Sequence, residues 1–272
     1  MGSRRSYGSY NDGCAAAHAL DLVGDRWTMV VVRELLLGAK RFTEIQRDVL
    51  GIGPAVLTQR LHDLEAGGVL RRRRLPGRVD VYELTDWGRE LEAVNTALSR
   101  WAVASPALPR DADMSPDTVV LAMRAHARPA PGLADERRVA LHLTDSRYDD
   151  AEPVTYLATV SQHTTRVNRS AEPAATDAEV WATTRAWKAC VIGGVAIEDV
   201  ADVQVAGDDD AVRALLRATS LGNPPGTHDD APRSSRDRLT KGPPPASLED
   251  RLSSTQRSGA VAVAADEVTI IQ

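Results

Sequence analysis

The 272-residue sequence predicts an α+β fold in two domains, with a helical N-terminal domain that ends in a two-stranded hairpin and a smaller mixed domain behind it. Three observations support this prediction. Helical apolar spacings fill residues 14–66, and strand-like runs with turn signals fill residues 69–84. A linker containing Pro and Asp at 105–114 then precedes a second series of strand and helix patterns. The chain is long enough to build a core for each domain.

The segment from Gly53 to Gly68 has the signals of a complete helix. Gly53 can serve as the N-cap, and Pro54 at the first helical position has a suitable φ and no N–H to satisfy. An apolar stripe at i, i+4 and i+7 consists of Leu57, Leu61 and Leu64. The opposite face is short and polar and carries Ala55, Thr58, Gln59 and His62. Gly67 and Gly68 end the helix.

A hairpin rich in positive charge follows this helix. One strand opens at Val69-Leu70, the chain turns near Pro76-Gly77, and residues 79–84 return. Five arginines and no acid lie on the first strand and the turn, namely Arg71, Arg72, Arg73, Arg74 and Arg78. Because like charges on one hairpin repel each other, we expect the phosphates of a nucleic acid to neutralise them. The alternative is an edge strand that its charge keeps soluble.

Two helices are predicted near the N-terminus. Cys14 opens the first helix and Gly24 ends it. Its apolar face consists of Ala17, Leu20, Leu22 and Val23. Asp25 is placed to cap the second helix, at 26–37, which is apolar enough to be the buried centre of the domain. The apolar residues of that helix are Trp27, Val30, Val31, Leu35 and Leu36.

A third helix leads into the helix that begins at Pro54. Thr43 and Gln46 form a T-x-x-Q capping box, which predicts a helix through Val49. The spacing of this helix, the turn and the next helix is that of a helix-turn-helix, and the basic hairpin behind it indicates the winged form.

A long helix is expected after the hairpin. Thr85 can cap a helix from Asp86 to Ala104. A heptad-like apolar seam, spaced 4, 3, 4 and 3, consists of Trp87, Leu91, Val94, Leu98 and Trp101. Such a seam needs a partner helix. A second copy of the chain would supply one in a homodimer, and the alternative is packing on the chain's own first helix.

Residues 14–104 resemble the HxlR-type winged helix-turn-helix regulators. The resemblance rests on Cys14, the segments 19–28, 33–35, 41–44, 57–61 and 64–69, and the segment 82–85. It implies a homodimeric bacterial DNA-binding transcriptional regulator, neither enzyme nor cofactor carrier, that inserts the helix from Pro54 into the major groove of a palindromic operator and lays the hairpin on the backbone. The expected DNA-binding residues are Arg41, Thr43, Pro54, Ala55, Thr58, Gln59, Arg60, His62, Arg72, Arg73, Arg74 and Arg78.

The charge distribution fits this interpretation. Residues 1–100 carry 15 Lys and Arg against 13 Asp and Glu, whereas residues 101–272 carry 18 against 25. The net charge of −5 therefore does not argue strongly against nucleic acid, because the basic charge is concentrated where a duplex would lie. No run of about 18 apolar residues and no secretory signal is present, so we expect a cytoplasmic protein that is nucleoid-associated when bound to DNA.

The second domain is expected at 115–221. Ser115 and Pro116 start a helix, strands are expected at 138–144, 154–161 and 203–205, and helices at 177–187, 191–200 and after Asp208. The segment 175–218 faintly resembles the sterol-carrier-protein-2-like (SCP2-like) module. That resemblance implies a hydrophobic small-molecule effector, with Trp181 and Trp187 as candidate pocket residues, although ordinary core packing would explain both tryptophans equally well.

The remaining features concern alternatives and absences. Residues 1–13 are expected to be a flexible arm and residues 222–272 a largely disordered tail with an apolar end. Scattered histidines and only two cysteines give no metal-ligand spacing, and no catalytic motif is found. Two alternatives to ligand sensing remain: a hydrophobic-ligand carrier, and a redox or electrophile switch at Cys14. A buried structural role is the competing explanation for that cysteine.

Overall fold

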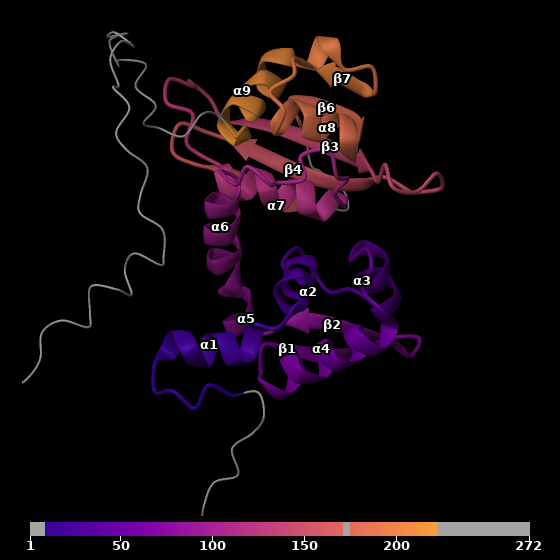
Figure 1. Cartoon of the computed structure of the whole chain (residues 1–272). Helices are drawn as coiled ribbons and strands as arrows, with labels where there is room; N and C mark the ends of the chain where they lie inside the picture. The colour runs from indigo at the N-terminus through magenta and orange to yellow at the C-terminus, as the bar shows by residue number, and fades with distance from the viewer. Residues whose placement is uncertain (1–8, 171–174, 222–272) are drawn as a thin grey trace, which may run out of the picture. The chain divides into compact units, whose positions relative to one another are not determined.

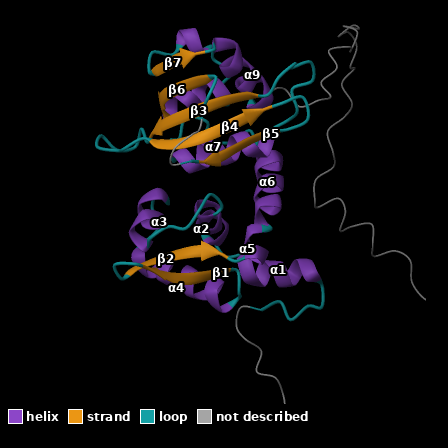
Figure 2. Ribbon diagram, turned by 180° about the vertical axis from the view of Figure 1, so that it is seen from behind, coloured by secondary structure: helices purple, strands orange, loops and turns teal. Residues whose placement is uncertain are grey.

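The computed structural model describes residues 9–170 and 175–221 (Figures 1 and 2). The first part contains α1 (Ala15–Val23), α2 (Thr28–Leu35), α3 (Phe42–Asp48), α4 (Pro54–Ala66), β1 (Leu70–Leu75), β2 (Val79–Leu84), α5 (Asp86–Arg89) and α6 (Leu91–Ala102). The second contains α7 (Pro116–His126), β3 (Arg137–Thr144), β4 (Val154–Val160), β5 (Thr165–Arg169), β6 (Ala178–Thr183), α8 (Thr184–Val191), the 3-10 turn η1 (Ile197–Asp199), β7 (Val203–Gly207) and α9 (Asp209–Thr219). Two separate hydrophobic cores correspond to these two parts.

The N-terminal core forms around α2 and α4. Its buried residues are Val31, Val32, Leu35, Ile45, Val49, Ile52, Leu57, Leu61, Leu64, Val69, Leu70 and Leu84. The predicted apolar stripe of α4 is therefore confirmed. The second helix is shorter than predicted, because Trp27 occupies its N-cap position with a left-handed backbone. The capping role predicted for Asp25 is wrong, since its carboxylate pairs instead with Arg60 of α4.

The start of α3 also differs from the prediction. Its N-cap is Arg41, and the backbone N–H of Arg41 donates to Glu44 Oε2 at 2.6 Å. Thr43 therefore lies within the first turn and does not cap the helix with Gln46. The acidic side chain is favoured because a carboxylate at the third helical position accepts from the free N–H and also interacts favourably with the helix N-terminus.

The helix predicted at 86–104 is divided. Thr85 caps it as expected, since its hydroxyl accepts from Gly88 N at 3.0 Å. Hydrogen bonds of the i→i−3 type from the N–H groups of Glu90 and Ala93 then separate the short α5 from α6. Gly88 lies against the carbonyl of Val69, where a Cβ would stand 1.9 Å from the oxygen. Glycine is thus required for this turn to pack on the chain that follows α4.

The second domain contains a five-stranded sheet in the order β5-β4-β3-β6-β7 (Figure 2). The pairing is antiparallel except between β3 and β6, which are parallel. Alternate residues of β3, β4 and β6 are buried on one face, where α7, α8 and α9 contact one another and the sheet. This one-sided cover gives the domain its core.

Several second-domain elements were predicted wrongly. The helix expected at 177–187 is strand β6 followed by α8, strand β5 was missed, and of the helix expected at 191–200 only the η1 turn forms. Residues 178–183 include Ala, Glu and Trp, which tolerate helix, so pairing with β3 and β7 decided their conformation. The starts of α7 and α9 are confirmed, with Ser115 and Asp208 as capping side chains.

Some predictions concern residues that the structure does not describe. They are the first eight residues of the N-terminal arm, the tail at 222–272 and its apolar end. The resemblance of 175–218 to the SCP2-like module stays a prediction. Among the helices in the described ranges, none has the length and hydropathy needed to cross a membrane.

Candidate nucleic-acid interface and interdomain contacts

The outer face of α4 is available to a partner. Pro54, Ala55, Thr58, Gln59 and His62 are exposed, opposite the leucines that anchor the helix in the core. The Gln59 amide donates to Asp63 Oδ1 at 2.7 Å, and the Thr58 hydroxyl donates to the carbonyl of Pro54 at 2.8 Å. These polar groups lie on a rigid helix, which is the arrangement needed to recognise base edges.

Three of the other expected DNA-binding side chains belong to the start of α3 and to α4. Arg41 and Thr43 are exposed at the start of α3, on the surface of the helix-turn-helix. Arg60 differs from them, because its side chain is largely buried and pairs with Asp25 and with Asp63. In this structure Arg60 therefore holds the turn before α2 to α4, and its guanidinium is not presented to solvent like the rest of the interface.

The hairpin charges are arranged differently from the prediction. Asp80 lies directly opposite Arg74 and pairs with both Arg72 and Arg74. Glu83 lies directly opposite Arg71. The Nε atoms of Arg71 and Arg73 donate to Glu83 at 2.7 and 3.0 Å. The return strand supplies a carboxylate to each face, so part of the arginine charge is neutralised within the hairpin; neutralisation by phosphates stays a prediction.

This pairing orders the hairpin and leaves it basic. Hydrogen bonds from Arg74 and Arg72 lower the pKa of Asp80 to about 2, so this carboxylate stays ionised at neutral pH. Two acids stand against five arginines, and Arg78 is exposed in the turn with a φ of 63°. The hairpin therefore offers ordered guanidinium groups with an excess of positive charge, as backbone contact with DNA requires.

The predicted heptad seam is largely exposed. Trp101 is 79% exposed, Trp87 52% and Leu98 47%, and α6 has no buried residue. Only Leu91 packs against the N-terminal core. Part of the seam also lines a groove of about 260 Å³ against α1, which includes Leu22 and Val23. The alternative, that the seam packs on the chain's own first helix, therefore holds for Trp87, Leu91 and Val94, which line this groove, but not for Leu98 and Trp101.

Cys14 is exposed at the N-cap of α1, and Cys190 is buried. Hydrogen bonds from the backbone N–H groups of Ala17 and Ala16 lower the pKa of the Cys14 thiol. Burial raises the pKa of the Cys190 thiol. The structure therefore contradicts a buried structural role for Cys14, and the two thiols differ in exposure and in the direction of their pKa shift.

The two tryptophans proposed for a ligand pocket lie in different environments. Trp187 is fully buried in the second core, where its indole N–H points to Met123 Sδ at 3.3 Å. Trp181 is 40% exposed and stacks on His142, with the ring centroids 5.0 Å apart. The structure does not bring them together around a common cavity, so Trp187 has the core role that was its alternative.

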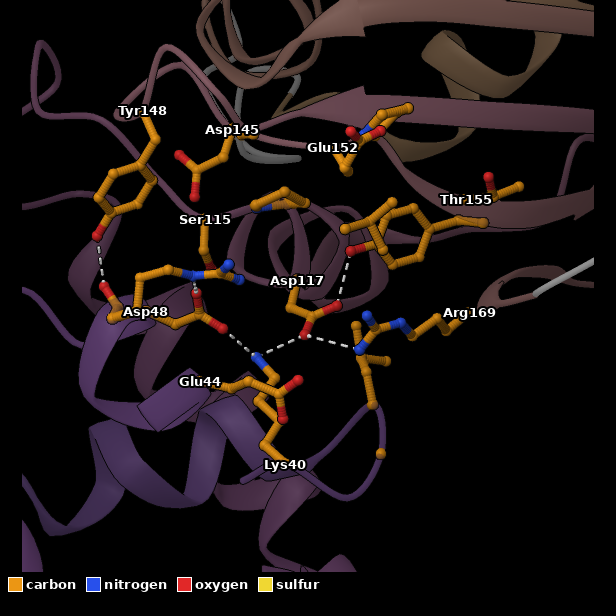
Figure 3. Close-up of a pocket in the computed structure, with 18 of the residues that line it drawn as sticks. Lys40, Glu44, Asp48, Ser115, Asp117, Asp145, Tyr148, Glu152, Thr155 and Arg169 are labelled. Carbon is orange, nitrogen blue, oxygen red and sulfur yellow. Dashed lines mark hydrogen bonds and ion pairs between the residues drawn. The ribbon is translucent and has the colours of Figure 1, made fainter. Parts of the chain in front are cut away.

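A buried lysine joins the two domains (Figure 3). Lys40 follows α2 and is 4% exposed, and its Nζ lies 2.9 Å from Glu34 Oε2, 2.8 Å from Asp48 Oδ2 and 2.7 Å from Asp117 Oδ2. Glu34 belongs to α2, Asp48 to α3 and Asp117 to the first turn of α7. The ammonium group therefore connects the helix-turn-helix domain to the second domain.

The second domain holds Asp117 in place from its own side. The hydroxyl of Tyr156 donates to Asp117 Oδ1 at 2.6 Å, and Arg169 Nη1 lies 3.7 Å from Asp117 Oδ2 (Figure 3). Burial and the charge of Asp117 raise the pKa of Tyr156, which therefore remains a phenol donor. Since a buried carboxylate needs such partners, Tyr156 and Arg169, together with Lys40, make Asp117 a fixed acceptor.

Further contacts cross the domain boundary near α3. Arg147 Nη1 donates to the carbonyl of Asp48 at 3.0 Å, and the hydroxyl of Tyr148 donates to the carbonyl of Arg47 at 2.7 Å. The end of α3 is thus bound by the loop after β3, which satisfies carbonyl groups that a helix end leaves free.

Two cavities lie at this boundary. The larger, about 1010 Å³, is the polar cleft of Figure 3, which includes Lys40, Glu44, Asp117, Glu152 and Arg169. The smaller, about 520 Å³, has a mainly apolar lining from α2, α6, α7 and α8. Its lining includes Val30, Leu98, Ala102, Leu121, Ala122 and Ile192. Within the described part of the chain, no three metal-ligating side chains gather as a metal site would require.

The ion network could not be found from the sequence. Lys40, Glu34 and Asp117 follow no motif, and charged residues of these types are usually exposed. Lys40 and Glu34 meet within the first domain, and the packing of α7 against α2 and α6 brings Asp117 to them. The nearest sequence signal was the predicted start of α7 at Ser115-Pro116, which places Asp117 in the first helical turn.

Comparisons with known proteins identify the family of the first domain. A family model for the HxlR-like helix-turn-helix matches residues 22–107. The chain is 31% identical over 104 residues to the uncharacterised HTH-type transcriptional regulator YybR of Bacillus subtilis, and it covers 82% of that protein and 37% of its own length. It is 37% identical over 87 residues to YvaP of the same organism, also an uncharacterised HTH-type regulator, covering 80% of it and 31% of its own length.

A solved structure of the redox regulator HypR in its oxidised form matches with 29% identity and a TM-score of 0.33, covering 35% of this chain and all of that chain. The family model ends before α7, so it describes the first domain only. From the family match and the two relatives, the protein belongs to the HxlR-like helix-turn-helix family and is a DNA-binding transcriptional regulator.

Proposed function

We propose that this regulator binds a palindromic operator as a homodimer, with α4 in the major groove and the β1–β2 hairpin on the adjacent backbone. The observation that carries the proposal is the exposed polar face of α4 beside an ordered hairpin with more arginines than acids. The side chains of α4 would distinguish bases, and those of the hairpin would hold phosphates.

Arginine substitutions test the hairpin part of this proposal. Arg72→Ala with Arg74→Ala should weaken binding to every duplex and reduce the salt dependence of the affinity by about one unit for each phosphate that is no longer bound. Operator titrations by fluorescence anisotropy at several salt concentrations measure both quantities. An unchanged salt slope would show that these arginines bind only Asp80.

The dimer part rests on the exposed seam of α6. A twofold-related operator requires two recognition helices, and an apolar stripe spaced like a heptad favours a second copy as its cover. Val94→Asp with Trp101→Asp places unpaired charge in the seam, so it should give a monomer with weak operator binding. Leu91 is avoided because it also packs on the core. Ala93→Asp, exposed outside the seam, is the matched control. A dimeric double variant in sedimentation would exclude α6 as the interface.

We further propose that a small hydrophobic effector binds in the apolar cavity of about 520 Å³. Its size and lining suit a small ligand, and it contacts α2, α6 and the second domain at once. The faint resemblance to the SCP2-like module, whose members enclose a hydrophobic tunnel, is consistent with this ligand class. A hydrophobic-ligand carrier, the remaining alternative, would tolerate loss of the hairpin arginines without loss of operator affinity.

A thermal-shift screen of apolar compounds tests the effector proposal. A ligand should raise the unfolding temperature and change operator affinity, because it can shift DNA binding only through different affinities for two states. Ala122→Phe should fill the cavity and remove both effects. Retention of both effects in that variant would place the ligand elsewhere.

A redox switch is the second candidate, favoured by the exposure and lowered pKa of Cys14. Diamide or a quinone should then release operator from the wild type and leave Cys14→Ser bound. Cys190→Ser is the matched control, because that thiol is buried. Equal oxidant responses of the wild type and Cys14→Ser would remove Cys14 as the sensor.

A further inference from the structure

Lys40 makes connections in two directions. Its backbone pairs with the hairpin, since Lys40 N donates to the carbonyl of Tyr82 at 3.0 Å and Tyr82 N donates to the carbonyl of Lys40 at 2.8 Å. Its side chain binds Asp117 of the second domain at 2.7 Å. One residue thus touches both the β1–β2 hairpin and α7.

The hairpin end of this connection lies next to the arginines. Tyr82 stands directly opposite Arg72 in the β1–β2 register, and Arg72 shares Asp80 with Arg74. Because two backbone hydrogen bonds join Lys40 to Tyr82 of β2, a change in the position of Lys40 would change the orientation of the β1–β2 hairpin relative to the helices of its domain. The phosphate contacts of the hairpin depend on that direction, because guanidinium bonds to phosphate require defined geometry.

The second-domain end is equally fixed. Asp117 is 4% exposed and is held by Tyr156 and Arg169 as well as by Lys40. Both side chains of the ion pair are thus buried, and each is bonded to further residues of its own domain. Such a continuous series of contacts can couple the position of the second domain to that of the hairpin.

We propose that Lys40 is a positioning residue for DNA binding, and that its ion pair with Asp117 lets the second domain set the orientation of the hairpin on the operator. The proposal rests on the DNA-binding function of the family and needs neither the dimer nor the effector. It gives the second domain a role in operator affinity even without a ligand.

Asp117→Asn is the informative variant. Asparagine keeps an acceptor for the Tyr156 hydroxyl, and Lys40 keeps Glu34 and Asp48 as partners inside its own domain. The substitution therefore weakens the link between the domains without leaving the ammonium unpaired. We expect a loss of operator affinity of about tenfold, within the usual range of coupling between sites.

The decisive measurement combines Asp117→Asn with the alanine substitutions of Arg72 and Arg74. Asp117→Asn should weaken operator binding in the wild-type background and reduce its salt dependence, but have no further effect when Arg72 and Arg74 are both alanine. The matched control is Glu92→Gln, which breaks the ion pair of 2.7 Å between α6 and Arg124 of α7, away from the hairpin. Its effect should add to that of the arginine substitutions.

The proposal would be overturned if the losses of operator affinity for Asp117→Asn and for the arginine substitutions were additive, or if Asp117→Asn caused no loss.

Amide hydrogen exchange supplies a second test that needs no DNA. The N–H of Tyr82 should exchange faster in Asp117→Asn than in the wild type or Glu92→Gln, while the amides buried within α4 stay protected. Equal acceleration of all amides would indicate general destabilisation and also contradict the proposal. Failure of the wild type to bind any operator would instead count against the proposed function.

Discussion

The outer helices of the two domains use apolar residues in opposite ways. In the DNA-binding domain, α1 and α6 bury no residue, although α6 carries Trp101, 79% exposed, and Leu98, 47% exposed. In the second domain, most of α9 is buried against the sheet, and most of α7 is buried between the sheet, α8 and α9 on one side and α2 and α6 on the other. Within the described residues, the apolar side chains of α9 are thus covered by the chain itself, whereas those of α6 stay partly exposed.

The difference follows from spacing. The buried residues of α9 follow the helical period and face one sheet, and they are Ala211, Val212, Ala214, Leu215 and Ala218. The apolar residues of α6 follow a narrower heptad stripe, and within the described residues the chain covers them only in part, at the groove against α1 and at the apolar cavity shared with α7. The two patterns therefore predict different consequences for the same kind of substitution.

The largest expected effect is in the second core. Leu215→Ala should lower the free energy of unfolding by about 2–5 kcal/mol, because Leu215 is fully buried and leaves a cavity. Leu98→Ala on α6 should change it by no more than about 0.5 kcal/mol in dilute protein, where no second copy covers it. Urea unfolding measures both values. A cost for Leu98→Ala equal to that for Leu215→Ala would remove the distinction between the two helices.

The boundary between the two regions should be sensitive to acid. Burial opposes ionisation of Glu34, but Lys40 and Arg33 outweigh it and lower the pKa from an ordinary 4.5 to about 2. A lowered folded-state pKa gives stability that is present above pH 4.5 and is lost as the pH falls to about 2, on the order of 3 kcal/mol. Glu34→Gln should reduce the dependence of the free energy of unfolding on pH between pH 4.5 and 2. The same substitution at the exposed Glu136 should leave this dependence unchanged. A curve for Glu34→Gln as steep as that of the wild type would contradict the assignment.

The exposed face of α4 should affect recognition and not folding. Gln59→Ala should change the preference between base pairs by about 1–3 kcal/mol. It should leave urea unfolding within about 0.5 kcal/mol, since the side chain bonds only Asp63 in the free protein. Competition with operators changed at single positions measures the preference. Equal weakening on every sequence would mean that Gln59 does not contact a base.

A smaller loss of stability than in the core is expected at the open face of the second-domain sheet. Trp181→Ala removes the stack on His142 and should cost about 0.5–1.5 kcal/mol, less than a core substitution such as Leu215→Ala. It should also leave effector-induced thermal shifts unchanged, because Trp181 lines neither boundary cavity. Loss of the effector-induced thermal shift in Trp181→Ala would indicate that the ligand binds at the open face of the sheet and not in the apolar cavity.

The sequence was a better guide to the first domain than to the second. Local signals such as Gly53-Pro54 and Gly67-Gly68 marked the ends of α4, and the hairpin strands followed from their alternation and turn. In the second domain, β6 is paired on both sides with strands distant in sequence, so no local signal identified it. A helix was predicted there because its residues tolerate either conformation.

Helix α4, the basic hairpin and the apolar seam could be predicted from the sequence alone, because each is encoded by residues within a few turns of one another. The pairing of the charges could not, and it depends on the folded arrangement. Strand register places Asp80 and Glu83 beside the hairpin arginines, and domain packing brings Asp117 to Lys40. Ion pairs depend on distances of a few ångströms between groups far apart in the chain, and such distances exist only once the cores have formed.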